Sequence, residues 1–496
     1  MKVRYYLVCA LALLSAAALT GISHLVSETA EAVEITESAQ LGDPAVAAEL
    51  ALQARFDENR RLNWETSLVP GQTPTTQFYM RKSSAYSHDP SPFRAECYLQ
   101  SYFNSGEMGD QLEITEWNYG PVAPLFQEIA DRTQPGTVHT EAVLLEDHFD
   151  CFPLEFYVNS DTMDSHMIRH LLAEEHLSPA GEAHYQKVLD FLDQLRDTFR
   201  FPVPKGMQVT FQVCKASDGS IQILNSVEGA PVVPLKDHAY DPTQGDYGFP
   251  ETDADQFLRT FCHSINVGQT LYFLPELRLG EEQALLDYSL TPGYGLYRLD
   301  LSEDVPTMKE LSLVCPLQED QLIAGLTLDD SGKRILLTTQ TGKETALHVL
   351  DAATGELRQS FPIGTQSEQD WVYTISDGPI LMAIQVREEL SSFRLYIQGQ
   401  QGDYQFQYTG DFPQSFPFYW SSGVTLAFDG QRLAAVATAH SSREEPQCSF
   451  SLLVWDRDSL LYAGNYDASL NRSPRGDTQF HSINPSREEP FSLKFT

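Results

Sequence analysis

The chain has 496 residues, of which 42% are apolar, so it can build a substantial hydrophobic core and is not a disordered chain. Asp and Glu number 69 against 33 Lys and Arg, giving a formal net charge of −36. A surface this acidic repels phosphate backbones, which argues against nucleic acid as a partner and favours bound cations or basic partners. The same excess of acid also serves simply to keep an exported protein soluble.

The first 26 residues predict a signal-anchor or transmembrane segment. Lys2 and Arg4 precede an uncharged apolar run from about Tyr5 to Ile22, and the next basic residue is Arg55. By the positive-inside rule the start of the chain stays in the cytoplasm and the rest is exported. The run is long for a signal peptide and at the short edge for a spanning helix, so an uncleaved membrane anchor is preferred to a cleaved, secreted form.

Residues 27–74 predict an acidic linker and a stalk helix. The stretch "SETAEAVEITESAQLGD" is rich in small and acidic residues. In "PAVAAELALQARFDENRRLNWE" that follows, Val46, Leu50 and Leu52 are apolar and the arginines come late, which is typical of a helix. We place the main domain after this segment, over residues 75–496.

A second helical segment is predicted at about 164–200, as an insertion between strands. Ser178 and Pro179 suit a helix N-cap and first turn. Apolar residues then recur at spacings of three and four, at Tyr185, Val188, Leu192, Leu195 and Phe199. Such a stripe packs on a core.

Three groups of residues that contain histidine are candidate functional sites. His166, His170 and Glu174 share one helix face, but "HLLAEEH" lacks the H-E-x-x-H pattern, so a solvated polar face is preferred to a metal site. Two further pairs, His139 with Glu141 and His148 with Asp150, alternate as on a strand and are read as structural.

An acidic loop, "YDPTQGDYGFPETDADQ", is the one candidate metal site. It gathers Asp241, Asp246, Glu251, Asp253 and Asp255. Clustered carboxylates suit Ca²⁺, which prefers oxygen ligands, although the spacing of an EF-hand is absent. The default for such a run is an exposed acidic loop, and no other cofactor is identified.

The C-terminal half contains a run of short β-like segments. The clearest stretch runs from Leu326 to Gly364, and its first β-like segment begins slightly earlier, at Leu322. Its four segments read "LIAGLTL", "RILLTTQ", "ALHVLDA" and "LRQSFPI". Turn residues separate them, at Asp330 to Gly332, Thr341 to Lys343 and Ala353 to Gly355. Four short strands with a turn at each junction are typical of one blade of a β-propeller.

This stretch resembles β-propeller repeats of the YVTN, quinoprotein-like and WD type. In those repeats a "DG+" turn leads into the second strand and "V-x-D-x-x-T-G" ends the third. Here Asp330-Ser331-Gly332-Lys333 and Val349 to Gly355 occupy those places. The match is good over residues 326–364 and weaker elsewhere. It implies a mainly β fold with a ligand or protein bound at a propeller face.

The turn glycines recur along the chain. Gly332, Gly378, Gly430 and Gly476 are separated by about 45 to 55 residues, a propeller-like period. Upstream, residues 257–317 predict another blade and residues 207–226 a hairpin across Asp218 and Gly219. We therefore expect about six or seven four-stranded blades.

The pentapeptide "SREEP" occurs twice, at Ser442 to Pro446 and Ser486 to Pro490. Both copies are expected in the turn before a third strand. The chain would then end in a blade that lacks its outer strand, and an exposed edge invites aggregation. We expect a segment near the start of the domain, Thr75 to Ser83, to supply that strand and close the ring.

Two functions compete. G-x-S-x-G and phosphate-binding glycine loops are absent from the sequence, and the five Trp form no repeating motif of the quinoprotein kind. The first hypothesis is therefore a membrane-anchored, non-catalytic binding or scaffold module at the cell envelope, with an envelope or extracellular protein or a small ligand at a propeller face. The alternative is a hydrolase or lyase with a funnel active site.

Overall fold

The structure is a computed structural model in which part of the chain is described. The described residues are 15, 33–58, 62–68, 75–80, 95–101, 120–160, 179–203, 206–215, 217, 221–228, 258–279, 284–285, 293–302, 305, 307–318, 320–365, 371–386, 391–413, 424–438, 450–470, 484–485 and 491–496. They form two compact units. Unit 1 comprises residues 1–89, 329–331 and 362–496, and unit 2 comprises 90–328 and 332–361.

The predicted signal-anchor segment, residues 1–26, lies outside the described residues apart from Ser15. Among the helices that are described, none is both long and apolar enough to cross a membrane.

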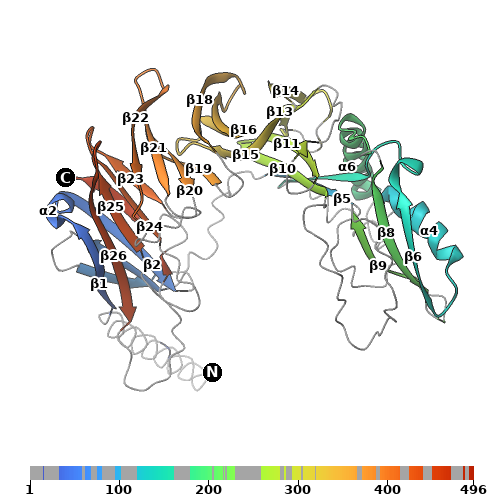
Figure 1. Cartoon of the computed structure of the whole chain (residues 1–496), viewed down its shortest axis with the longest axis horizontal. Coiled ribbons are helices and arrows are strands. Elements are labelled where there is room, and N and C mark those ends of the chain that lie inside the picture. The colour runs from blue at the N-terminus through green and yellow to red at the C-terminus, as the bar shows by residue number, and fades with distance from the viewer. Residues whose placement is uncertain are drawn as a thin grey trace, which may run out of the picture. The chain divides into compact units, whose positions relative to one another are not determined.

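The protein is mainly β, and most of its strands form four-stranded antiparallel sheets in chain order (Figure 1). The first contains β10 (Leu258–Val267), β11 (Thr270–Leu279), β13 (Gly295–Asp300) and β14 (Leu311–Pro316), with the short β12 (Ala284–Leu285) beside β11. The next contains β15 (Gln321–Leu328), β16 (Arg334–Thr341), β17 (Glu344–Asp351) and β18 (Leu357–Thr365). These two sheets confirm the blades predicted at 257–317 and 326–364.

Two more such sheets follow along the chain. One contains β19 (Trp371–Asp377), β20 (Ile380–Val386), β21 (Ser392–Gln398) and β22 (Tyr404–Asp411). The other contains β23 (Thr425–Phe428), β24 (Leu433–Thr438), β25 (Phe450–Trp455) and β26 (Leu460–Leu470). Each sheet thus repeats the same up-and-down order.

The predicted turn glycines lie between the first and second strands of successive sheets. Gly332, Gly378 and Gly430 have φ angles of 66°, 55° and 100°, values that L side chains rarely adopt. Glycine at these turns is therefore a backbone requirement. Gly476, the fourth in the series, lies outside the described residues.

The first strands of neighbouring sheets lie side by side within each unit. In unit 2, β10 lies between β5 (Ala95–Ser101) and β15; in unit 1, β23 lies between β19 and β28 (Phe491–Phe495). This arrangement buries both faces of a sheet. On β11 the Phe273 ring contacts Phe199 at a centroid distance of 5.8 Å, while the next residue back, Tyr272, donates its hydroxyl to the carbonyl of Ala352 on the other side.

The N-terminal segment is built of strands, so the predicted linker and stalk helix over residues 27–74 are wrong. Among the described residues of this segment, only Pro44–Ala47 (α2) are helical; around them lie β1 (Val33–Gly42), β2 (Leu50–Glu58), β3 (Leu62–Leu68) and β4 (Thr75–Met80). Burial shows why: Leu50, Leu52 and Ala54 are buried while Gln53 is exposed. The apolar period there is two, which suits a strand.

These N-terminal strands pair with the end of the chain. β1 adds a fifth strand beside β26, and β28 pairs with β2 to complete a sheet with β3 and β4 (Figure 1). The short β27 (Asn484–Pro485) also pairs with β2. Pairing between the two ends of the chain is confirmed. Thr75–Met80 (β4) is the outermost strand of the sheet that takes up β28, as predicted, but the strand that pairs directly with β28 is β2 and not β4.

The two "SREEP" copies precede different kinds of strand. The first precedes β25, the third strand of its sheet, as predicted. The second precedes β28, an edge strand next to β2, so the prediction of a third strand there is wrong. Both pentapeptides lie outside the described residues.

A cluster of polar contacts holds the two ends together. The guanidinium of Arg432 bonds Glu49 and Asp429, with nitrogen–oxygen distances of 2.7 Å to each carboxylate, and lies over the Phe495 ring. The backbone N–H and the hydroxyl of Thr496 both donate to the carbonyl of Glu49. The last residue of the chain is therefore bonded to the start of β2.

Residues 95–228 depart from the expected blade pattern. They form a two-stranded sheet of β5 and β7 (Leu154–Ser160) and a three-stranded sheet of β6 (Thr137–Leu144), β8 (Gln208–Lys215) and β9 (Ile221–Glu228). Two helices join them, α4 (Ala123–Arg132) and α6 (Pro179–Thr198), the first preceded by a single turn, η1 (Gly120–Val122). The pairing of β8 with β9 confirms the predicted hairpin, and α6 confirms the described part of the helical insertion.

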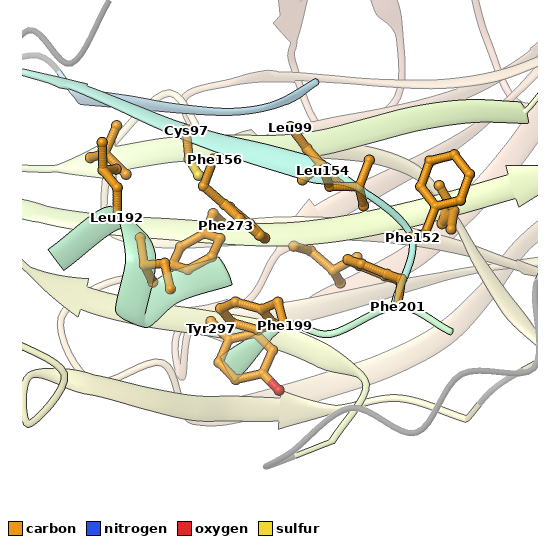
Figure 2. Close-up of a cluster of buried hydrophobic side chains, with 14 of the residues drawn as sticks. Cys97, Leu99, Phe152, Leu154, Phe156, Leu192, Phe199, Phe201, Phe273 and Tyr297 are labelled. Carbon is orange, nitrogen blue, oxygen red and sulfur yellow. The ribbon is translucent and has the colours of Figure 1, made fainter. Parts of the chain in front are cut away.

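The core of this segment is aromatic. Figure 2 shows Phe199, from the end of α6, close to Phe273 and Tyr297, and its ring meets Tyr297 edge-on at 4.7 Å between centroids. The predicted stripe residues Val188, Leu192, Leu195 and Phe199 are all buried. The helix α4 was missed, although Leu125, Phe126 and Ile129 follow a helical spacing and are buried.

Substitution in β28 tests the pairing of the chain ends. Phe491 is 5% exposed and packs against Phe450, so Phe491→Ala should lower the free energy of unfolding by about 3 kcal/mol in urea titrations. Ser492 is the exposed neighbour on the same strand, and Ser492→Ala should change it by less than about 0.5 kcal/mol. Equal effects of the two substitutions would contradict a paired, buried β28.

Candidate functional site

One face of the β5–β7 sheet is polar and aromatic, and we call it the tyrosine face. On β5, Ala95, Cys97 and Leu99 are buried, whereas Glu96 and Tyr98 between them are exposed. Tyr98 is 46% exposed, which is unusual for a large aromatic side chain. The strand thus turns its apolar side to the core and leaves a carboxylate and a phenol ring on the other side.

The partner strand completes this face. Tyr157 of β7 lies directly opposite Tyr98, and Glu96 lies opposite Asn159. The Tyr98 hydroxyl donates to Glu96, and the Tyr157 hydroxyl donates to Glu155 over 2.7 Å. Neither strand contains Lys or Arg. Tyr98 and Glu96 are exposed and Tyr157 is half-buried, whereas Glu155 is only 5% exposed. The exposed ring and carboxylate suit a cationic group, which the ring attracts through its face and the carboxylate through charge.

A buried carboxylate lies at the next junction between sheets. Glu276 of β11 is fully buried and accepts hydrogen bonds from the Tyr294 hydroxyl at 2.8 Å and from the backbone N–H of Ile323 at 3.1 Å. Its second oxygen is 3.5 Å from Nε2 of His263. Because Ile323 belongs to β15, this carboxylate joins two sheets.

The thiol of Cys262 lies on the opposite side of β10 from His263. Burial raises its pKa well above the usual range, and contact with Cys97 and the charge of Glu276 raise it further. A thiol is a nucleophile only as thiolate, so this group is poorly suited to nucleophilic catalysis at neutral pH.

A buried histidine connects three strands of one sheet. On β17, Nε2 of His348 lies 2.8 Å from the Thr339 hydroxyl on β16, and Nδ1 lies 3.0 Å from the Ser360 hydroxyl on β18. A neutral ring can donate from one nitrogen and accept at the other, which both hydroxyls can match. Burial lowers the pKa of His348 and so favours that neutral form.

The residues singled out in the sequence fall in different places. The five candidate calcium ligands, Asp241, Asp246, Glu251, Asp253 and Asp255, lie outside the described residues. His166, His170 and Glu174 lie outside them too. Within the described ranges, His, Cys, Asp and Glu come together in no group of three that could hold a metal ion.

The two His–acid pairs differ. His139 and Glu141 share a face of β6, with Nε2 and Oε2 3.1 Å apart, and Glu141 also pairs with Arg132 of α4, so the structural reading is confirmed. The strand expected at His148 and Asp150 is wrong: Leu145–Asp147 form a single helical turn, η2, because the N–H groups of His148 and Phe149 donate back to Leu145.

The tyrosine face was missed from the sequence, although a signal exists. "AECYLQS" and "LEFYVNS" both alternate apolar with polar or tyrosine residues, which is typical of a strand with one exposed face. What the sequence does not contain is the pairing that sets Tyr98 opposite Tyr157.

Comparisons with known proteins give distant likenesses. No protein-family model and no curated protein matches the chain. Similar solved structures include the β-propeller domain of Cps50 (Swd1) from Myceliophteria thermophila (13% identity, 51% of this chain and 82% of that chain, TM-score 0.21). They also include the β-propeller domain of the Trilobed protease from Pyrococcus furiosus (10% identity, 54% of this chain and 69% of that chain, TM-score 0.21). A third is the periplasmic gluconolactonase of Pseudomonas aeruginosa (15% identity, 47% of this chain and 60% of that chain, TM-score 0.22).

These neighbours include β-propeller domains and a gluconolactonase. At such identities and TM-scores they carry no argument about function. The blade-like character of the sheets rests on the strand order and on the adjacency of first strands within each unit.

The buried histidine generates a pH prediction. In the unfolded chain an imidazole takes up its proton near pH 6.5, whereas in the fold the pKa of His348 is lowered. The unfolded state therefore binds more protons below about pH 6.5, and the free energy of unfolding falls as the pH drops. His348→Gln should make the fall between pH 7 and 5 shallower, by at most about 1.4 kcal/mol per pH unit, in urea titrations across pH.

Thr341 at the end of β16 provides the control. Its side chain is exposed and carries no titratable group, so Thr341→Ser should leave the pH dependence as in the parent protein. If His348→Gln also leaves it unchanged, the imidazole at 348 does not titrate differently in the fold.

Proposed function

We propose that the protein is a membrane-anchored β-propeller of six or seven blades that acts as a non-catalytic binding or scaffold module at the cell envelope. The tyrosine face of β5 and β7 is its binding surface, and its partner carries a cationic side chain or ligand group. The observation that carries the proposal is Tyr98, a 46% exposed ring beside Glu96 on strands without a basic residue.

The chemistry of the tyrosine face favours a cation. A guanidinium or ammonium group above a phenol ring gains roughly 0.5–2 kcal/mol, and carboxylates beside the ring add charge-assisted hydrogen bonds. The net charge of −36 acts at longer range, because it attracts basic partners and raises their rate of encounter. A basic segment of an envelope or extracellular protein meets both conditions.

A propeller enzyme with a funnel active site is the alternative. Three titratable groups inside the described part of the chain serve the fold: Glu276 bonds two sheets, His348 connects three strands, and Cys262 packs against Cys97. Perturbed groups are the usual candidates for acid–base work, and here they serve packing, which favours the binding role.

Binding of basic peptides tests the function. A fluorescent arginine-rich peptide should bind the purified protein at physiological salt, and a peptide with citrulline in place of arginine should bind much more weakly. Tyr98→Ala should raise the Kd by about 3- to 30-fold in anisotropy titrations, because the ring no longer faces the cation. Unchanged binding by Tyr98→Ala would contradict the site.

A charge-matched variant separates the tyrosine face from the general acidity of the protein. Glu96→Gln and Glu344→Gln remove one negative charge each, and Glu344 is exposed at the start of β17. Only Glu96→Gln should weaken binding of the arginine-rich peptide, measured as a higher Kd. Equal weakening would mean that the peptide binds the overall charge and not this surface.

The membrane anchor rests on the apolar run between Tyr5 and Ile22 after Lys2 and Arg4. We expect tagged protein in the membrane fraction, with its N-terminal residues retained in sequencing and its main domain digested by protease added outside the cytoplasmic membrane. A soluble exported form that begins after Ala32 would instead identify a cleaved signal.

A further inference from the structure

Two buried thiols meet where the β5–β7 sheet packs on the first four-stranded sheet. Cys97 of β5 is fully buried, and Figure 2 shows it in the aromatic core with Phe156 nearby. Cys262 of β10 packs against the same core. Cys97 is close enough to raise the pKa of the Cys262 thiol, and β5 and β10 lie side by side, although the two residues come from distant parts of the sequence.

Backbone geometry places the two strands independently of that contact. The N–H of Cys97 donates to the hydroxyl of Ser264 at 3.1 Å, across 167 residues of sequence. Side chains two residues apart on a strand share a face, so Cys262 and Ser264 both point towards β5. The two cysteines are therefore presented to each other by strands of neighbouring sheets that lie side by side, and a disulfide requires such proximity.

We propose that Cys97 and Cys262 form a disulfide that fastens β5 to β10 when the chain folds in an oxidising compartment. The oxidant is a disulfide such as glutathione disulfide. One cysteine thiolate attacks a sulfur of that disulfide and releases one glutathione thiolate. The other cysteine then attacks the protein sulfur of the mixed disulfide and releases the second, so the protein dithiol loses two electrons and two protons and the oxidant becomes two thiols.

Burial determines when this bond can form. Thiol–disulfide exchange needs a thiolate and access, and the fold disfavours both: Cys97 is fully buried, and Cys262 is half-buried with the pKa of its thiol raised by burial. The bond therefore forms during folding, before the core closes. Once formed, it resists reductants until the core opens.

The test is refolding of the full chain followed by peptide mapping. Denatured, reduced protein is refolded in a mixture of glutathione and glutathione disulfide, then unfolded in iodoacetamide without reductant and digested. Mass spectrometry should find a peptide pair joined through Cys97 and Cys262, lighter than the two reduced peptides by about 2 Da because two hydrogens are lost. Cys151, which is half-buried and contacts Arg200, should carry the alkyl group instead.

Stability gives a second readout. A cross-link that closes so long a loop should raise Tm by about 5 °C or more over protein refolded with reductant. The increase should survive in Cys151→Ala and vanish in Cys262→Ala. Dithiothreitol added to the folded protein should leave the bond intact, whereas dithiothreitol with denaturant should break it.

The peptide map of the parent protein decides the proposal without any variant. Separate alkylation of Cys97 and Cys262 after refolding, glutathione adducts on either one, or a cross-link of either to another cysteine would each overturn the proposal. If Cys262→Ala does not fold, the peptide map of the parent protein still decides.

Discussion

The structure depends on one constraint: a four-stranded sheet that is apolar on both faces must be covered on both. The sheet that begins with β10 illustrates it, because Phe273 packs on Phe199 while Tyr272 bonds the carbonyl of Ala352 on the opposite side. A sheet of this kind is unstable alone, so each one needs a neighbour. The side-by-side first strands within each unit are the geometric result.

The same constraint explains where the polar groups lie. A carboxylate or imidazole placed between packed sheets loses its water and must find partners within the protein. Glu276 finds them in Tyr294 and Ile323, and His348 finds them in two hydroxyls. Such groups hold neighbouring sheets and strands in fixed positions, so their burial does not by itself indicate a catalytic role. The tyrosine face differs because Tyr98 remains exposed.

The sequence allowed prediction of the sheets wherever strands and turns follow one another locally. Residues 321–365 carry both signals, and glycines such as Gly332 occupy the turns that require them. Pairing between distant segments leaves no local trace, which is why the direct partner of β28 was misplaced. In β2 a local signal exists, because Leu50, Leu52 and Ala54 alternate with less buried residues, and the helix prediction overlooked it. The candidate site was missed for the same reason: the facing of Tyr98 and Tyr157 is set by the pairing of β5 with β7.

The pairing of β28 with β2 also has a consequence for synthesis. β2 leaves the ribosome early, but its pairing with β28 must wait until Phe491–Phe495 emerge. Until then nascent protein lacks this pairing, and an open strand edge can be extended by other chains. Deletion of Phe491–Phe495 should therefore promote aggregation far more than a deletion of equal length in an internal loop.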